Sequence, residues 1–469
     1  MLKRSISSKL ADWKSRSDHH PLILRGLRQV GKTTTARQFG KDNYRHVVYI
    51  DLRANTSIHS VFDGDFSVDD MVTGITAADP SAIFEPGSTL LILDEIQDCP
   101  NARSSLKYWD LDHRYDVIAT GSFLGVKGFR KPYGRGIPVG FEEQLTMNAL
   151  TFQEFIRNIG INDGVLKHVL QSLQDGSPVM KPVHDSLRKY YLQYLIVGGM
   201  PEAVNMFLKT HDLNQVRAVQ AGIIRSMKDD FGRYFDSKGA ERVNEVLKLR
   251  AEACLDSLPA QLSKEYKKFQ YSLVDVRGQS TDKADGLQYL CDLGLAVRAF
   301  NLKEISAPLE GNKLPGEFKV FLADTGLFMS MLEPGTAASI LSGDLGPYKG
   351  AVAENMVAST FAAYDIPLYY YRGRTGSPEL DFVFSRNGEP TILECKATNT
   401  RATSMKYVLA HPEKYGPHPA IKLADTNVGG GSGFVTWPLY ALSFAASETQ
   451  VSVSDFSDVD ALNRLFPEN

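Results

Sequence analysis

Residues 26–33 read Gly-Leu-Arg-Gln-Val-Gly-Lys-Thr and decide the fold of the N-terminal part of the chain. Their spacing matches GxxxxGK[ST], in which glycines let the backbone turn tightly and present N–H groups to phosphate oxygens. The lysine would reach the β- and γ-phosphates, and the following hydroxyl would reach Mg²⁺. An apolar run precedes the motif and a helix-compatible run follows it, which is the context that this chemistry needs. The sequence therefore predicts a site for ATP and Mg²⁺ at Gly26, Gly31, Lys32, Thr33 and Thr34.

A second motif follows downstream, where residues 90–95 read Leu-Leu-Ile-Leu-Asp-Glu. Asp94 at the carboxyl end of an apolar strand suits a water-mediated contact with the Mg²⁺ that Thr33 also holds, and Glu95 can polarise the attacking water. Alone, Asp-Glu after a strand is usually a solvated turn, and a glycine-rich turn can match the first motif by chance. Because both occur in order, we assign Mg²⁺ binding to Thr33 and Asp94, and catalysis to Lys32 and Glu95.

A strand expected at 117–122 ends in hydroxyl and glycine residues. Thr120 or Ser122 is a candidate sensor of the γ-phosphate, with a hydroxyl of no special role as the equal alternative. Arg130 and Arg135 follow shortly after and are candidates for an arginine finger, although surface solvation is the more common fate of such residues. The sequence leaves these assignments open.

Strand-like runs alternate with helical runs in the N-terminal part, which predicts an α/β fold with a parallel sheet. The character becomes helical after residue 150, and strand-like runs return from about residue 368. We expect an AAA-type P-loop domain at 1–150, a helical lid or linker at 151–238, a winged-helix-like domain at 239–339 and a nuclease-like α/β domain at 340–469.

Four residues near the carboxyl end form an ordered set. Residues 379–384 read Glu-Leu-Asp-Phe-Val-Phe, and Glu394-Cys395-Lys396 follows in the next apolar run. Glu394 and Lys396 share one strand face because side chains alternate, whereas Cys395 points to the opposite side. With Glu354 on the preceding helix, Asp381, Glu394 and Lys396 form the pattern of PD-(D/E)xK nucleases, in which carboxylates hold Mg²⁺ and a lysine stabilises charge. The alternative for each piece is an exposed ion pair or a strand-end acid.

Composition limits the class of protein. Apolar residues make up 43% and the net charge is -3, so there is no global electrostatic signal for nucleic acid, and any DNA contact must be local. One such contact is predicted at 263–270, where Tyr266 and Phe269 alternate with lysines; a solvated amphipathic helix is the alternative. The four scattered cysteines form no CxxC pair. Without a signal-peptide core or a long apolar run, we expect a cytoplasmic protein with no membrane contact.

Nearly the whole chain resembles a widespread group of prokaryotic AAA-type ATPases whose carboxyl half is a domain of unknown function. The resemblance rests on segments that occur in this order: GLRQVGKTTTARQF, LLILDEIQ, VIATGS, LTFQEF, YLIVGGMPEAV, KFQYSLV, FKVFLADTGLF, GAVAENMVA, PELDFVF and ILECKA. It implies phosphate contacts at Gly31, Lys32 and Thr33, a winged-helix middle and a restriction-endonuclease-like end. One departure is Phe141, which stands where relatives often have a basic residue after Pro-Val-Gly.

These observations together predict an ATPase whose nucleotide state controls a DNA-binding carboxyl half, with nuclease activity left open. One alternative is a signalling or defence switch with a catalytically inactive nuclease-like domain. Another is an ATP-dependent scaffold. ATP, Mg²⁺, DNA and a second copy of the chain are the expected partners.

Overall fold

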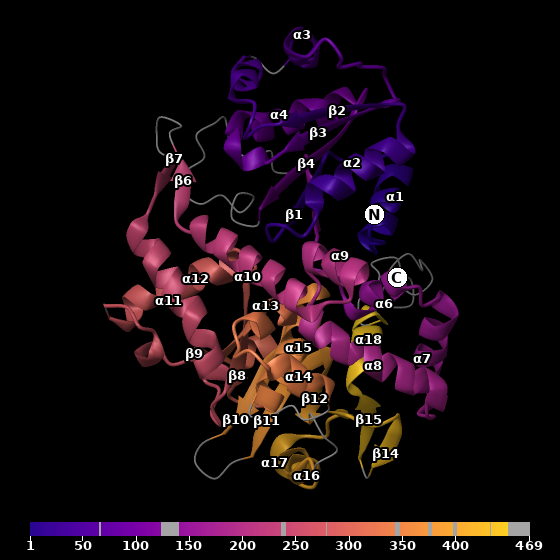
Figure 1. Cartoon of the computed structure of the whole chain (residues 1–469), viewed down its shortest axis with the longest axis vertical. Coiled ribbons are helices and arrows are strands. Elements are labelled where there is room, and N and C mark those ends of the chain that lie inside the picture. The colour runs from indigo at the N-terminus through magenta and orange to yellow at the C-terminus, as the bar shows by residue number, and fades with distance from the viewer. Residues whose placement is uncertain are drawn as a thin grey trace, which may run out of the picture.

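The computed structural model describes residues 1–64, 67–122, 140–235, 241–277, 279–342, 348–373, 378–396, 401–431 and 433–448. The strands of the N-terminal part lie at one end of the molecule and those of the C-terminal part at the other, with a layer of helices between them (Figure 1). The arginine-finger candidates Arg130 and Arg135 lie outside the described residues.

The N-terminal sheet has five parallel strands in the described part of the chain, in the order β2-β3-β4-β1-β5. Their bounds are β1 Leu22–Gly26, β2 His46–Asp51, β3 Thr89–Asp94, β4 Asp116–Ser122 and β5 Glu143–Thr146. The expected parallel α/β sheet is confirmed, and β4 lies between the strands that end in the two motifs. The polar ends of β1, β3 and β4 therefore meet at one edge of the sheet, where open α/β sheets bind ligands.

Helices cover both faces of this sheet because its central strands are apolar on both sides. Leu90 and Ile92 of β3 pack into one hydrophobic core, and Leu91 and Leu93 pack into another. The first core includes residues of α1 and α2, and the second includes residues of α3 and α4. The bounds are α1 Ile6–Ser15, α2 Lys32–Asn43, α3 Val68–Ala78 and α4 Pro100–Asp112, with short 3-10 helices at η1 Thr56–Phe62 and η2 Ile96–Asp98.

The following segment is helical, as the sequence predicts. Its first helix begins at a capping box, in which the Thr151 side chain accepts from the Glu154 N–H and Glu154 accepts from the Thr151 N–H. The bounds are α6 Phe152–Ile159, α7 Asp163–Asp175, α8 Lys181–Val197, α9 Pro201–Thr210 and α10 Leu213–Asp229. After the ribbon β6 Arg233–Phe235 and β7 Glu241–Val243 come α11 Glu245–Leu262, η3 Tyr271–Leu273 and α12 Ser280–Asp292.

The C-terminal sheet is mixed and runs β14-β15-β13-β12-β11-β10-β8-β9 in the described residues. Its bounds are β8 Ala296–Leu302, β9 Lys313–Leu322, β10 Tyr369–Arg372, β11 Glu379–Arg386, β12 Glu389–Lys396, β13 Ala420–Ala424, β14 Gly429–Gly431 and β15 Phe434–Pro438. The β8–β9 ribbon, which lies within the range expected for the winged-helix-like domain, pairs through β8 with β10. One sheet therefore draws strands from both sides of the expected boundary at residue 339, and the domain boundaries stay predictions.

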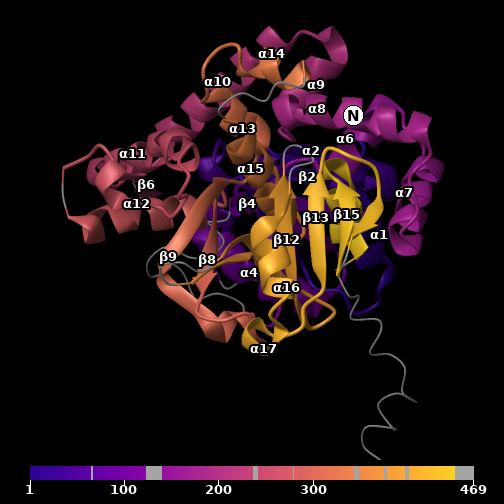
Figure 2. The same ribbon diagram turned by 90° about the horizontal axis from the view of Figure 1, so that it is seen from below.

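Helices α15 and α16 pack on the C-terminal sheet. The helices of this part have the bounds α13 Thr325–Ser330, α14 Thr336–Leu341, α15 Lys349–Ala363, α16 Thr403–Leu409, α17 Pro412–Tyr415 and α18 Leu442–Glu448, with η4 Leu309–Asn312 and η6 Leu439–Ala441. Phe361 of α15 packs against Phe384 of β11, with ring centroids 4.8 Å apart. Met405 and Val408 of α16 belong to a separate core with Ile392 of β12, and α16 lies beside β12 in Figure 2. Among the described residues, no helix has the length and apolar content needed to cross a membrane.

Candidate functional site

The phosphate-binding motif forms a tight loop between β1 and α2. Gly31 has φ 95°, a left-handed conformation that favours glycine, and Gly26 is required because a Cβ there would lie 2.1 Å from the Met147 carbonyl oxygen. Lys32 begins α2 and is buried, and its Nζ donates to the carbonyl oxygens of Gly26 and Leu27, both at 3.1 Å. Burial lowers the pKa of Lys32 to about 8. The loop therefore holds a cationic side chain where the motif predicts the phosphates.

The second motif meets the first through a hydroxyl. Thr33 Oγ1 donates to Asp94 Oδ1 at 2.9 Å, and Asp94 itself is buried at the end of β3. Thr120 of β4 donates to the same carboxyl group, and the Tyr49 hydroxyl donates to its other oxygen at 2.8 Å. Burial and then the bond to Asp94 raise the pKa of Tyr49, so this donor stays protonated. A hydroxyl and a carboxylate are hard oxygen donors of the kind that Mg²⁺ prefers, so these residues fit the ion.

Glu95, the expected water-polarising residue, follows Asp94 in a left-handed conformation with φ 54°. Its N–H donates to Thr120 Oγ1 at 3.3 Å, and its carboxylate accepts from the Gln97 side chain. Thr120 thus contacts both acidic residues of the motif, and Ser122 is buried at the end of the same strand. Thr34, the remaining residue of the predicted set, is exposed on α2. The structure brings the predicted residues to one edge of the sheet.

Two residues inside the loop contact the helical segment, and sequence reasoning missed both contacts. Arg28 forms an ion pair with Asp230, and Gln29 Nε2 donates to Ser226 Oγ of α10 at 3.1 Å. Burial lowers the pKa of Arg28, while the charge of nearby Glu95 opposes that shift. No local pattern could have revealed these partners, because they lie about 200 residues further along the chain.

The C-terminal acids form a second polar cluster. Lys396 Nζ lies 2.7 Å from Glu394 Oε1 and 3.5 Å from Asp381 Oδ2, so the predicted shared strand face of Glu394 and Lys396 is confirmed. The N–H of Cys395 donates to Asp381 Oδ2 at 2.9 Å, and its side chain is buried in the core on α15's side of the sheet. The Oε2 atom of Glu394 is buried without a hydrogen-bond partner.

Glu354 of α15 completes this cluster, but its lysine partners, one of them from the segment 263–270, were not predicted as such. Lys267 forms an ion pair with Glu354, and Lys319 of β9 lies 3.8 Å from its Oε2. Lys319 is almost fully buried and also pairs with Glu379 at 3.2 Å. Lys267, Lys319 and Lys396 therefore compensate the three predicted metal ligands, Glu354, Asp381 and Glu394.

The electrostatics follow from this pairing. Burial and the Asp381 charge raise the pKa of Glu394 to about 7, and burial and Glu354 raise the pKa of Asp381. Burial would also raise the pKa of Glu354, but Lys267 and Lys319 outweigh it and hold that pKa below its usual value. The described residues include no group of three or more His, Cys, Asp or Glu side chains placed to hold a metal. As it stands, ammonium groups compensate the carboxylates of this cluster, so a cation would have to displace at least one of them to bind.

The segment 263–270, with its two alternatives of a DNA contact and an amphipathic helix, is not helical. The helix expectation is therefore wrong: the backbone of this segment is irregular, and the segment contacts the C-terminal cluster through the ion pair of Lys267 with Glu354. The Arg372 guanidinium stacks on the Tyr266 ring, 3.9 Å from the ring centroid. Lys268 forms an ion pair with Glu317 at 3.1 Å, and Phe269 is buried. The DNA contact stays a prediction.

Three protein families match segments of the chain. Residues 18–156 match a family described as an AAA domain, and residues 188–337 and 349–442 match two families, each described as a domain of unknown function (DUF8612 and DUF4143). No curated protein matches the chain. Among solved structures, the chain is similar to the Pif1 helicase from Candida albicans at 18% identity and a TM-score of 0.23, over 40% of this chain and 47% of the helicase chain. The chain thus spans about half the length of that helicase, and it combines an AAA-type P-loop domain with two domains of unknown function.

Proposed function

We propose that this chain binds ATP with Mg²⁺ and hydrolyses it at the carboxyl edge of the N-terminal sheet. The single observation that carries this proposal is the contact of the Thr33 hydroxyl with the Asp94 carboxylate, beside buried Lys32. The AAA-domain match of residues 18–156 supports the same chemistry. A chance glycine-rich turn would have no reason to meet a strand-end carboxylate in this way.

Each side chain has a defined role in this proposal. On ATP binding, Lys32 would exchange its bonds to the loop carbonyls for bonds to the β- and γ-phosphates. Thr33 would contact Mg²⁺ through its hydroxyl, and Asp94 would contact the ion through water. The ion supplies charge neutralisation for the transferred phosphoryl group. Glu95 orients and polarises the attacking water, and Thr120 fixes both the Asp94 carboxylate and the Glu95 backbone.

Phosphate release from ATP tests this proposal. The purified chain should release phosphate in a Mg²⁺-dependent manner, and Glu95→Gln should slow turnover by about 100-fold or more while ATP still binds. Glu85→Gln is the matched control, since Glu85 precedes β3 at its opposite end and pairs with Arg45. Turnover of Glu95→Gln equal to that of Glu85→Gln would remove Glu95 from its role.

A second candidate function belongs to the C-terminal half: binding of DNA under nucleotide control, with metal-dependent cleavage. It is favoured by the convergence of Asp381, Glu394 and Lys396 and by the buried Glu394 oxygen that lacks a hydrogen-bond partner. Cleavage would require Lys267 to leave Glu354, because the cluster is charge-compensated without a cation. The winged-helix and restriction-endonuclease-like assignments belong to this proposal.

The rival for the C-terminal half is a switch or scaffold whose nuclease-like cluster is catalytically inactive. Nicking of plasmid DNA with Mg²⁺ or Mn²⁺, with and without ATP, separates the two. Under the nuclease proposal, Asp381→Ala stops nicking while phosphate release persists, because the two sites lie in different sheets. Salt-sensitive DNA binding without nicking favours the switch, and neither binding nor nicking favours the scaffold.

A further inference from the structure

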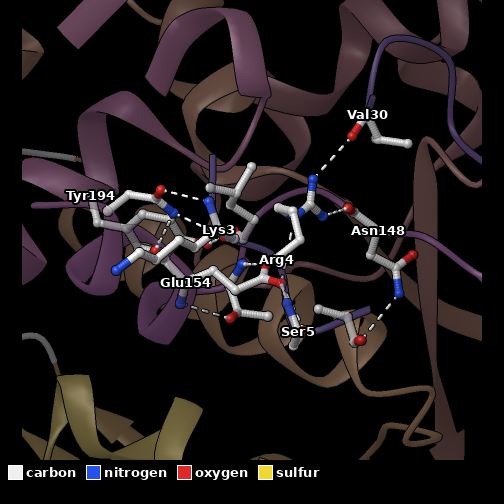
Figure 3. A network of polar contacts seen from close by, with 11 residues as sticks. Lys3, Arg4, Ser5, Val30, Asn148, Glu154 and Tyr194 are labelled. Carbon is white, nitrogen blue, oxygen red and sulfur yellow. Dashed lines mark hydrogen bonds and ion pairs between the residues drawn. The ribbon is translucent and has the colours of Figure 1, made fainter. Parts of the chain in front are cut away.

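A short N-terminal segment, Lys3–Ser5, lies between the phosphate-binding loop and α6 (Figure 3). The backbone of Lys3 forms two hydrogen bonds with the Asn158 side chain: its N–H donates to Oδ1 at 2.7 Å, and its carbonyl accepts from Nδ2 at 3.0 Å. The next side chain, Arg4, points inward and is only 6% exposed. Burying a guanidinium is costly unless its donors find partners, so the contacts of Arg4 indicate what it does.

The Arg4 guanidinium bridges two backbone carbonyls. Its NH1 donates to the Val30 carbonyl at 3.0 Å and its NH2 donates to the Asn148 carbonyl at 2.5 Å, as Figure 3 shows. The Nε atom faces Glu154 Oε1 at 3.4 Å. Val30 belongs to the phosphate-binding loop, and Asn148 lies in the connection between β5 and α6. The planar fork of arginine can hold two acceptors at once, whereas a lysine ammonium cannot reproduce this geometry.

Glu154 holds the guanidinium in this position. Its Oε1 accepts from the Ser5 N–H and the Ser5 hydroxyl, both at 2.7 Å, and its Oε2 accepts from the Thr151 N–H at 3.0 Å. The carboxylate is itself buried and compensates the Arg4 charge. The Arg4 guanidinium therefore lies between the Glu154 carboxylate on one side and the Val30 carbonyl of the loop on the other.

The Val30 carbonyl belongs to the same peptide unit as the Gly31 N–H. A trans peptide is planar, and its C=O and N–H point in opposite directions. The peptide bond between Val30 and Gly31 is not among the cis bonds of the described chain. By fixing the Val30 carbonyl from outside the loop, Arg4 directs the Gly31 N–H to the opposite side, toward the position that the motif assigns to phosphate.

We propose that Arg4 is a positioning residue of the nucleotide site, which presets the Val30–Gly31 peptide so that its N–H meets a phosphate oxygen of ATP. This inference rests on the proposed function of the loop. The simpler alternative is that Arg4 only ties the N-terminal segment to α6. In a folded variant that lacks the Arg4 guanidinium, the positioning role predicts weaker ATP binding, whereas the purely structural role predicts unchanged ATP affinity.

The test uses the full chain with Arg4→Lys, which keeps a charge beside Glu154 but loses the fork. The dissociation constant and KM for Mg-ATP should rise about tenfold, the size of one hydrogen bond to a charged group. The kcat at saturating ATP should stay within about twofold, because the lost contact serves binding. The apo protein should melt near the wild-type temperature, and its 26–33 backbone should exchange hydrogen faster. Arg157→Lys, at a half-buried position of α6 that pairs with Asp163, is the matched control.

A second variant guards against a folding defect. Arg4→Met combined with Glu154→Gln removes both charges and keeps one carbonyl oxygen, which can accept from Ser5 while the bond from the Thr151 N–H is lost. If it folds, as its unfolding temperature without nucleotide establishes, it should also bind ATP about tenfold more weakly. The proposal is overturned if Arg4→Lys binds ATP as the wild type does, or if hydrogen exchange of 26–33 is unchanged. A wild-type chain that binds no ATP would instead refute the proposed function, and the inference would fail with it.

Discussion

The hydroxyl of Thr33 lies 2.9 Å from the carboxylate of Asp94, although 61 residues separate them along the chain. Thr33 follows the first residue of α2 and Asp94 ends β3, so the parallel sheet brings the two motifs to one edge. Tyr49 and Thr120 hold the same carboxylate from the two neighbouring strands. Three hydroxyl groups therefore fix the Asp94 carboxylate at the end of β3.

Removal of this hydroxyl should separate metal dependence from nucleotide binding. In Thr33→Val, Mg²⁺-dependent turnover should fall by about 10- to 100-fold, because one oxygen donor to the ion is lost. ATP affinity in the presence of EDTA should match that of the wild type. Turnover assays across a Mg²⁺ titration check this prediction, and a wild-type Mg²⁺ dependence in Thr33→Val would contradict it.

The pKa of Lys32 predicts a pH dependence of ATP binding. Burial lowers this pKa to about 8, so the free protein loses the Lys32 charge as pH rises through that value. Binding requires the ammonium, and ATP affinity should therefore fall roughly tenfold from about pH 7 to pH 9. The free energy of unfolding depends on pH in the opposite direction. The pKa of an unfolded lysine is 10.5 and that of folded Lys32 about 8, so the free protein becomes more stable as pH rises between these two values.

Calorimetric titrations of Mg-ATP at several pH values measure this effect directly. Lys32→Arg is the control, since a guanidinium does not titrate in this range. Its affinity for ATP, whatever its size, should not change with pH. An affinity of the wild type that is constant from about pH 7 to pH 9 would refute the role given to the Lys32 charge.

Local sequence predicted the loop and strand ends of the candidate nucleotide site and the shared strand face of the C-terminal cluster. The phosphate-binding motif specifies a loop within eight residues, and strand alternation correctly placed Glu394 with Lys396 on one strand face and Cys395 on the other. Tyr49, Arg28 and Arg4 could not be predicted, because their roles depend on contacts made only when distant segments pack. The place of β8 could not be predicted for the same reason: its apolar pattern does not reveal that it pairs with β10.

Two helical glycines should respond oppositely to alanine. A Cβ on Gly286 of α12 would lie 2.6 Å from the Arg250 backbone of α11, whereas nothing lies within 4 Å of one on Gly222 in α10. Gly286→Ala should therefore destabilise the protein by about 2 kcal/mol. Gly222→Ala should stabilise it by up to about 1 kcal/mol through helix propensity. Denaturant unfolding of both variants decides the matter, and equal stabilities would contradict the close packing of α11 on α12.

Lys267 should control cation binding at the C-terminal cluster. In Lys267→Met, the Glu354 carboxylate loses its compensating ammonium, and the affinity for Mn²⁺ should rise by about tenfold. Lys264→Met, at an exposed position of the same segment, is the matched control and should bind Mn²⁺ as the wild type does. Calorimetry without nucleotide measures both. Equal Mn²⁺ affinity of Lys267→Met and the wild type would argue against the cluster as a metal site and favour the switch or the scaffold.

The central claim is that residues 26–33 and Asp94 form an ATP site, and titration of Mg-ATP into the wild type and Lys32→Ala tests it most directly. The wild type should bind one ATP per chain. Loss of the Lys32 charge should weaken binding on the order of 30-fold, the cost of its bonds to phosphate. Unfolding temperatures measured without nucleotide establish that the variant is folded. Equal ATP affinity of the two proteins, or no binding by the wild type, would contradict the account.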